Sequence, residues 1–286
     1  GYFGSFLLAG AACATGVFAS AISKSSVIGF VISLALTIWS NFYIGYMVCI
    51  YVAAYFFFYL YAYGDGRNNP RGEKAHKLRS FIRIAVFSAI GVAISAFIIL
   101  GAYYSLGFGK NEFSNPDWSL TAKFNVLDFL TKFLPSSYDT VRPEGIPFVY
   151  TGVLTLMLVP IFFLSKKISL REKLSSGAFI GFFILSFFAS TLDLIWHGFQ
   201  RPNWLNYRYS FMFCFVLLVV GCKAFGNLRR VNEKFILAIC AFIVLFVCVC
   251  EKLEFETYTV SAEKLDSIFT VWFTVAITIA LFAILC

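Results

Sequence analysis

Charged side chains are scarce in this chain, and their scarcity excludes an ordinary soluble domain. Asp, Glu, Lys and Arg together make up 13% of the 286 residues, about half the share that soluble domains carry. Phe alone supplies 36 residues, and 60% of the chain is hydrophobic. A bilayer core roughly 30 Å thick needs about 20 apolar residues per helix, and several uncharged stretches reach or approach that length. The sequence therefore predicts a membrane protein.

Motifs for common enzyme chemistry are also missing. The two histidines, His76 and His197, are too few for a histidine-rich metal centre, and neither an HExxH motif nor a CxxC pair occurs. The eight cysteines lie within or at the edges of apolar runs, so we interpret them as small buried hydrophobes. No Gly-rich phosphate loop follows a strand. We therefore assign no metal site and no cofactor, and we leave a requirement for a divalent metal open.

The apolar runs predict an all-α fold, a polytopic transmembrane helix bundle with about nine spans. Helices satisfy their backbone groups internally, and these runs are apolar on every side, unlike the alternating strands of a barrel. The uncharged run over residues 25–64 is too long for one span, so we expect two passes that reverse near residues 39–42. The first pass is short, which leaves a re-entrant segment as the alternative. The other expected spans cover residues 1–23, 84–108, 146–164, 175–192, 209–222, 235–250 and 268–286.

Basic residues gather in alternate loops, and this pattern predicts the orientation in the membrane. Short cytoplasmic loops are enriched in Lys and Arg. One alternate set of loops carries fifteen Lys/Arg and four Asp/Glu, whereas the other set carries eight Lys/Arg and eleven Asp/Glu. The first set is expected in the cytoplasm, with Gly1 outside and Cys286 inside. This topology accounts for the net charge of +8 without nucleic-acid binding.

We expect a single transmembrane domain over residues 1–286, with two outer loops at residues 109–146 and 193–208. Both chain ends lie inside apolar runs, so we expect the chain to be part of a longer protein. Within the first outer loop, residues 124–134 place apolar side chains at helical spacing, which predicts a short amphipathic helix at the interface.

The loop at residues 193–208 concentrates polar side chains beside the membrane. Arg201, Arg208 and His197 form a candidate site for an anionic headgroup, because guanidinium groups pair with phosphate oxygens in a fork geometry. The alternative is structural: Trp and Tyr side chains form an interfacial belt, and Asp193 pairs with an arginine to lock the hairpin.

The loop at residues 109–146 ends in a turn-rich stretch that contains Asp139 and Arg142. These two side chains either belong to a site or close the turn themselves, and both interpretations stay open. The candidate substrate-binding residues of the two loops are Asp139, Arg142, Asp193, His197, Arg201, Asn203, Tyr207 and Arg208.

Four separated motifs, in this order, resemble the YfhO family of bacterial membrane proteins. They are SNFYIGYM at 40–47, PSSYDTVRPEG at 135–145, KKISLREK at 166–173 and WHGFQRPNWLNYRYSF at 196–211. That family is similar to the GT-C superfamily of polytopic glycosyltransferases, so the resemblance implies a GT-C-like fold. It also implies an enzyme, a polyprenyl-phosphate-sugar-dependent glycosyltransferase of the bacterial cell membrane that modifies lipoteichoic acid, teichoic acid or a related envelope polymer.

The resemblance also implies the partners and the catalytic base. The partners are a polyprenyl-phosphate-linked sugar, an envelope polymer as acceptor and membrane lipids. In GT-C enzymes an acidic residue of the first large outer loop generally acts as the base, and that loop is expected upstream of Gly1. Asp193 is an available outer carboxylate, but it does not match that motif by position. A transporter or flippase for a lipid-linked substrate and a non-enzymatic membrane scaffold are the alternative functions.

Overall fold

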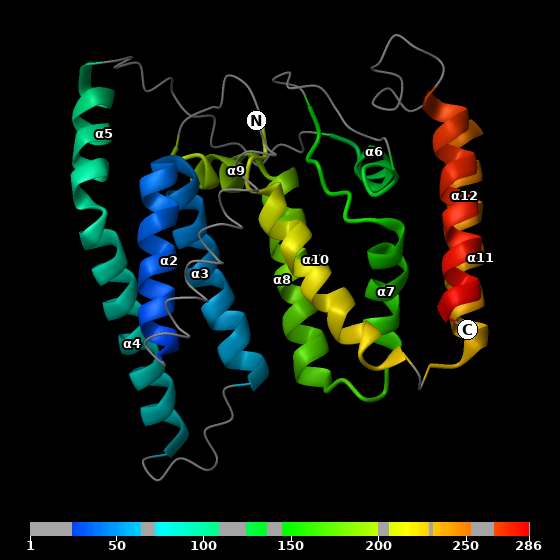
Figure 1. Cartoon of the computed structure of the whole chain (residues 1–286), viewed down its shortest axis with the longest axis horizontal. Helices are drawn as coiled ribbons and strands as arrows, with labels where there is room; N and C mark the ends of the chain where they lie inside the picture. Colours follow the sequence, from blue (N-terminus) through cyan, green and yellow to red (C-terminus); the bar gives the residue numbers. More distant parts are fainter. Residues whose placement is uncertain are drawn as a thin grey trace. The chain divides into compact units, whose positions relative to one another are not determined.

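The computed structural model describes residues 25–63, 72–108, 124–135, 145–199, 206–228, 231–252 and 266–285. The elements over these ranges are helices (Figure 1), which confirms the expected all-α membrane fold. The contacts divide the chain into two compact units. Unit 1 comprises Gly1–Asp117 and Leu194–Arg201, and unit 2 comprises Trp118–Asp193 and Pro202–Cys286. The expected span over residues 1–23 lies outside the described residues.

Unit 1 begins with a helical hairpin. Helices α2 (Ser26–Ser40) and α3 (Phe42–Tyr63) lie side by side and are joined at Asn41, which confirms the expected reversal (Figure 1). The Asn41 side chain caps the start of α3. Its Oδ1 atom accepts hydrogen bonds from the backbone N–H groups of Tyr43 and Ile44, at 3.0 and 3.1 Å. Such an acceptor satisfies donors that the first turn of a helix leaves without an intrahelical partner.

A second break divides the next apolar segment of unit 1. Helices α4 (Gly72–Ile94) and α5 (Ala96–Phe108) meet at Ser95 with a bend of 64°. The Ser95 side chain is fully buried, and its hydroxyl lies 3.1 Å from the carbonyl oxygen of Gly91 and 3.2 Å from that of Ala35 on α2. A serine that bonds back to the preceding turn bends helices. The sequence did not predict this break within the span expected at residues 84–108.

Unit 2 contains the remaining helices, except that α9 continues from Leu194 into unit 1. They are α6 (Val126–Thr131), α7 (Val153–Leu164), α8 (Leu170–Phe188), α9 (Ser190–Trp196), α10 (Ser210–Phe225), α11 (Glu233–Lys252) and α12 (Asp266–Leu285). The boundary with unit 1 runs through α9. Helix α7 packs against α10, and α11 packs against α12. Helix α6 confirms the short helix expected within residues 124–134, and Asn125 caps its first turn through a hydrogen bond from the Leu127 N–H group.

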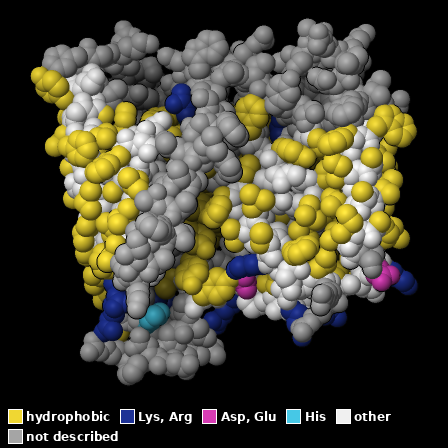
Figure 2. Space-filling model, viewed as in Figure 1, with side chains coloured by type: hydrophobic (Ala, Val, Ile, Leu, Met, Phe, Trp, Pro, Cys, Tyr) yellow, Lys and Arg dark blue, Asp and Glu magenta, His cyan; other side chains and the backbone are white. Residues whose placement is uncertain are grey.

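The lengths of the helices agree with a membrane environment. Among the described residues, α3 and the Glu233–Cys250 part of α11 are long and apolar enough to cross a bilayer, and the bent α4–α5 pair becomes a third if it counts as one span. Large hydrophobic side chains cover much of the visible surface (Figure 2). In water such exposure would be costly, whereas lipid chains are a suitable solvent for it. The number of spans and their sidedness stay predictions.

Candidate functional site

The structure describes four of the eight candidate residues, Asp193, His197, Tyr207 and Arg208, and they belong to two separate clusters. Asp193, Tyr207 and Arg208 are in unit 2, and His197 is in unit 1. The other four candidates lie outside the described residues; they are Asp139, Arg142, Arg201 and Asn203. We therefore describe each cluster within its own unit.

The first cluster surrounds the carboxyl group of Asp193. This side chain is only 1% exposed, and its Oδ1 atom accepts a hydrogen bond of 3.1 Å from the hydroxyl of Tyr209. The same hydroxyl lies 2.9 Å from the carbonyl oxygen of Ser186 on α8. Because buried polar groups are costly unless they are hydrogen-bonded, these contacts tie the start of α10 to the break between α8 and α9.

Aromatic rings complete the first cluster. Tyr209 stacks on Phe187 with ring centroids 5.2 Å apart and planes 17° apart, and Tyr207 meets Phe187 edge-on at 5.9 Å. Burial, together with the negative charge of Asp193, raises the pKa of the Tyr207 phenol, so this residue is neutral at physiological pH. Tyr207 also has a φ of 54°, an uncommon backbone conformation that the surrounding packing must hold.

Arg208 occupies the turn between these two buried tyrosines and is itself half-buried. The sequence proposed that Asp193 pairs with an arginine to lock the hairpin. The structure shows that the Asp193 carboxyl group accepts a hydrogen bond from Tyr209, and the pairing of Asp193 with an arginine stays a prediction. In the sequence, Tyr209 looks like an ordinary interfacial tyrosine. No pattern therefore predicted that its hydroxyl would bind the Asp193 carboxyl group.

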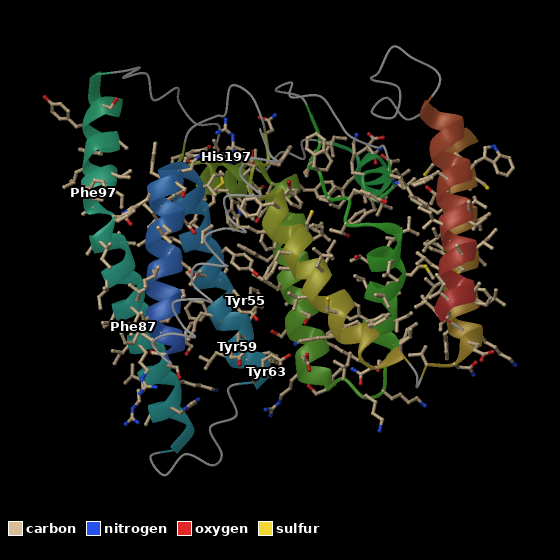
Figure 3. All side chains as sticks on the ribbon, viewed as in Figure 1. Tyr55, Tyr59, Tyr63, Phe87, Phe97 and His197 are labelled. Carbon is tan, nitrogen blue, oxygen red and sulfur yellow. The ribbon has the colours of Figure 1, made fainter. Side chains whose placement is uncertain are left out.

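The second cluster surrounds His197 in unit 1. The imidazole is 1% exposed and meets the ring of Tyr43 edge-on, with centroids 6.1 Å apart. Tyr46, one turn further along α3, donates its hydroxyl to the carbonyl oxygen of Ile195 at 2.8 Å. Figure 3 places His197 near the start of α3, with Tyr55, Tyr59 and Tyr63 further along that helix. The motif at residues 40–47 thus contributes the partners of a histidine that lies far away in sequence.

A Schellman motif ends α9 and positions His197. The N–H group of Phe199 donates to the carbonyl oxygen of Leu194 at 2.8 Å, and that of Gly198 donates to Ile195 at 3.3 Å. Gly198 has a φ of 65°, which is the left-handed conformation that this motif requires at its glycine. The glycine therefore fixes the direction in which the chain leaves the helix after His197.

A pocket of about 330 Å³ opens beside this cluster, within unit 1. Its walls come from α2, α3, both sides of the α4–α5 break and the turn after α9. The lining residues are Ile38, Phe42, Tyr43, Gly45, Tyr46, Cys49, Val92, Ile99, His197 and Gly198. The volume is at the lower end of the range for small-molecule sites. The Nε2 atom of His197 is buried, and no other described residue forms a hydrogen bond with this atom.

The described residues do not assemble a metal site: no group of three or more His, Cys, Asp or Glu side chains among them could hold an ion. Asp193 and His197, four residues apart in the chain, instead have different partners. The first is tied to tyrosines and phenylalanines of unit 2, and the second lies against α3 in unit 1.

Apolar helices with lipid-compatible surfaces and polar clusters at their ends define an all-α membrane protein. A family model described as "Bacterial membrane protein YfhO" matches residues 18–286, and the chain belongs to that family. The match includes all eight candidate residues and both described clusters. No curated protein and no solved structure matches the chain.

Proposed function

We propose that the protein is a membrane glycosyltransferase that moves a sugar from a polyprenyl-phosphate donor to an extracytoplasmic envelope polymer such as lipoteichoic or teichoic acid. Membership of the YfhO family, together with the resemblance of that family to GT-C glycosyltransferases, supports this reaction class. In the proposed topology the protein is a multi-pass protein of the bacterial cell membrane, with Gly1 outside and Cys286 in the cytoplasm. The loop at residues 193–208 then faces the outside, where the polymer is.

The observation that carries the proposal is the anchored turn that bears Arg208. Its neighbours Tyr207 and Tyr209 are buried, and the Tyr209 hydroxyl is hydrogen-bonded to Asp193 and Ser186. The turn that bears the guanidinium group is therefore anchored on both sides. A cation held in place before the reaction stabilises developing charge without the cost of reorganisation. This arrangement suits a phosphate that gains negative charge as it leaves the sugar.

The reaction that we propose is a direct displacement at the sugar. The hydroxyl oxygen of the acceptor attacks the anomeric carbon, the bond from that carbon to the phosphate oxygen breaks, and the polyprenyl phosphate leaves with the bonding electron pair. A base removes the hydroxyl proton, an effect worth roughly 10²- to 10⁴-fold in rate. Arg208, with Arg201 and Arg142 as further candidates, pairs with the leaving phosphate through its fork of N–H donors.

Asp193 fits a positioning role better than the role of this base. Its carboxyl group is 1% exposed and already accepts the hydrogen bond from Tyr209. A general base must approach the proton of an incoming acceptor within hydrogen-bond distance. We therefore assign Asp193 to holding the Tyr207–Tyr209 turn, and we assign no described residue as the base.

Sugar transfer can be tested with the purified protein in detergent, a polyprenyl phosphate that carries a radiolabelled sugar, and the envelope polymer as acceptor. We expect labelled polymer to form together with free polyprenyl phosphate in equal amounts. Donor lipid that stays intact in the presence of folded protein and acceptor would count against the proposal.

A transporter or flippase for a lipid-linked substrate is the second candidate, and a helix break favours it. Transporters often place substrates at interrupted helices, and the α4–α5 segment of unit 1 is interrupted at Ser95. Proteoliposomes separate the two functions, because a flippase moves the labelled lipid to the other leaflet without cleaving it. If the labelled lipid is neither cleaved nor moved, a non-enzymatic scaffold becomes the better proposal.

A further inference from the structure

We propose that one face of α4 is a docking site for an anionic diacyl phospholipid of the surrounding bilayer, with Arg79 and Arg83 at its phosphate and Ile82, Val86 and Ile90 along an acyl chain. The site lies on a single helix of unit 1. The inference does not rest on the proposed function, because this ligand is a component of the bilayer and not the sugar donor. It assigns a role to a surface that the proposed displacement at the sugar does not use.

Positive charge is concentrated at the start of α4. Four of the residues at positions 74–83 are Lys or Arg, and residues 74–94 contain no Asp or Glu. The side chains of Arg79 and Arg83 are exposed, and because they are four residues apart in a helix they leave it on the same side. In Figure 2, Lys and Arg side chains gather at the lower end of unit 1, below a largely hydrophobic surface. This distribution of charge is complementary to an anion.

Exposed aliphatic side chains continue the same face of α4 beyond the arginines. Ile82, Val86 and Ile90 follow at helical spacing, and their side chains are between 42% and 52% exposed. A helix rises 1.5 Å per residue, so Ile90 lies roughly 10 Å further along the axis than Arg83. The face therefore begins with charge and continues with hydrocarbon.

A phospholipid has the same order of charge and hydrocarbon. Arginine pairs with phosphate oxygens through its fork of N–H donors, and each basic residue near an anionic lipid surface strengthens binding by about fivefold. The aliphatic side chains favour a hydrocarbon neighbour over water. A single phospholipid supplies both parts, whereas an acidic peptide would need apolar side chains at a matching distance from its acid groups. The lipid is therefore the better occupant.

Contacts with α2 and α3 fix which face of α4 is turned outward. Gly91 is buried, and a methyl group on it would lie 3.1 Å from the Leu34 side chain of α2. The ring of Phe81 lies 6.2 Å from that of Phe56 and 6.4 Å from that of Phe57, both on α3. The bent α4–α5 pair is apolar enough to count as one membrane span. The outward face of α4 is therefore expected to meet lipid along its length.

Photocrosslinking of the protein in lipid nanodiscs tests the inference. Two probes carry the same diazirine-labelled acyl chain, one on phosphatidylglycerol, which is anionic, and one on phosphatidylcholine, which has no net charge. Digestion and mass spectrometry locate the adducts. We expect phosphatidylglycerol to label α4 near Val86 and Ile90 about fivefold more than phosphatidylcholine, or better. Equal labelling of α4 by the two lipids would overturn the inference and leave the arginines to an acidic protein partner.

Helix α5 provides an internal control for the labelling. It contains no charged residue, and its Leu100 and Tyr104 side chains are strongly exposed. We expect the two probes to label α5 equally, because acyl chains alone meet this surface. The same preference for phosphatidylglycerol on α5 as on α4 would show enrichment around the whole protein, and it would contradict a site on α4.

Two double variants with the same change in charge make the test specific. Arg79→Gln with Arg83→Gln removes the proposed phosphate contacts, whereas Lys166→Gln with Lys167→Gln removes two exposed cations from the loop before α8 in unit 2. We expect the first variant to lose the preference for phosphatidylglycerol on α4 and the second to keep it. A preference that survives in the first variant, or an equal loss in both, would refute the role of the two arginines.

Salt provides a measurement on the unchanged protein. Raising the ionic strength from about 0.1 M to about 1 M shortens the Debye length from about 10 Å to about 3 Å. Since both arginines are exposed, we expect the preference for phosphatidylglycerol on α4 to fall severalfold. A preference that does not change with salt would assign the selectivity to headgroup packing and would contradict pairing of the arginines with the phosphate.

Discussion

The hydroxyl of Tyr209 reaches the buried carboxyl group of Asp193 across 3.1 Å, and it thereby joins the first turn of α10 to α9. The two residues are sixteen positions apart, with the candidate residues of the 193–208 loop between them. A substitution that removes this contact is therefore expected to loosen both ends of the loop, not only a single side chain.

Tyr209→Phe should destabilise the protein, because it leaves the Asp193 carboxyl and the Ser186 carbonyl without this donor in a buried place. The expected loss is about 1–3 kcal/mol in the free energy of unfolding, measured by thermal unfolding in detergent. Tyr103→Phe is the control, since the side chain of Tyr103 is 78% exposed. Equal stability of the two variants would show that the contact between Tyr209 and Asp193 contributes little.

Arg208→Ala should remove most sugar transfer without changing the amount of protein in the membrane. Loss of one preorganised group that stabilises a leaving anion costs about 10²- to 10³-fold in kcat, and the labelled-donor assay measures it. Arg208→Lys should be intermediate, since it keeps the charge and loses the fork of donors. Arg171→Ala, an exposed arginine at the start of α8, is the matched control. Full transfer by inserted Arg208→Ala protein would exclude the proposed role.

Gly45→Ala should separate α2 from α3, because the new methyl group would meet the backbone of Ile38 at 2.8 Å. Overpacking of this kind costs about 1–3 kcal/mol, which denaturant unfolding in detergent resolves. Gly101→Ala in α5 provides a control at a position with no atom within 4 Å. That variant should be unchanged or slightly more stable, since alanine favours helix by roughly 1 kcal/mol. An unchanged free energy of unfolding in Gly45→Ala would mean that α2 and α3 pack less closely than they do in the structure.

Orientation in the membrane can be measured by cysteine labelling in a variant that lacks the native cysteines. Phe199→Cys should react with an impermeant maleimide added to intact cells, and Lys167→Cys should react only after the cells are opened. Both positions are exposed in the structure, and the basic loop that contains Lys167 is expected in the cytoplasm. The reverse pattern of reactivity would put the 193–208 loop inside and remove its access to the envelope polymer.

The sequence predicted the fold where a local pattern was sufficient. Uncharged runs revealed the apolar helices, and the excessive length of residues 25–64 revealed the hairpin at Asn41. Ser95 had no comparable signal, since an isolated serine in an apolar run is compatible with a straight helix. Its bend depends on a carbonyl of α2, 60 residues away, and such a tertiary contact leaves no periodic pattern.

The candidate residues show the same division. The polar composition of the 193–208 loop identified Asp193 and His197 as unusual, but it could not show that their partners are Tyr209 and Tyr43. Those two tyrosines occur in aromatic-rich segments where many rings look equivalent. The division of the candidates between two units depends on a boundary that runs through α9, a helix of seven residues that has no sequence signature of its own.

The break at Ser95 gives unit 1 a mechanical property. Val92 and Ile99, which line the pocket, stand on opposite sides of this serine, and its hydroxyl is within reach of acceptors on both α2 and α4. Such a pivot can retain one acceptor while the angle between α4 and α5 changes. Because Val92 and Ile99 both line the pocket, the angle that Ser95 sets between α4 and α5 also sets the distance between these two walls.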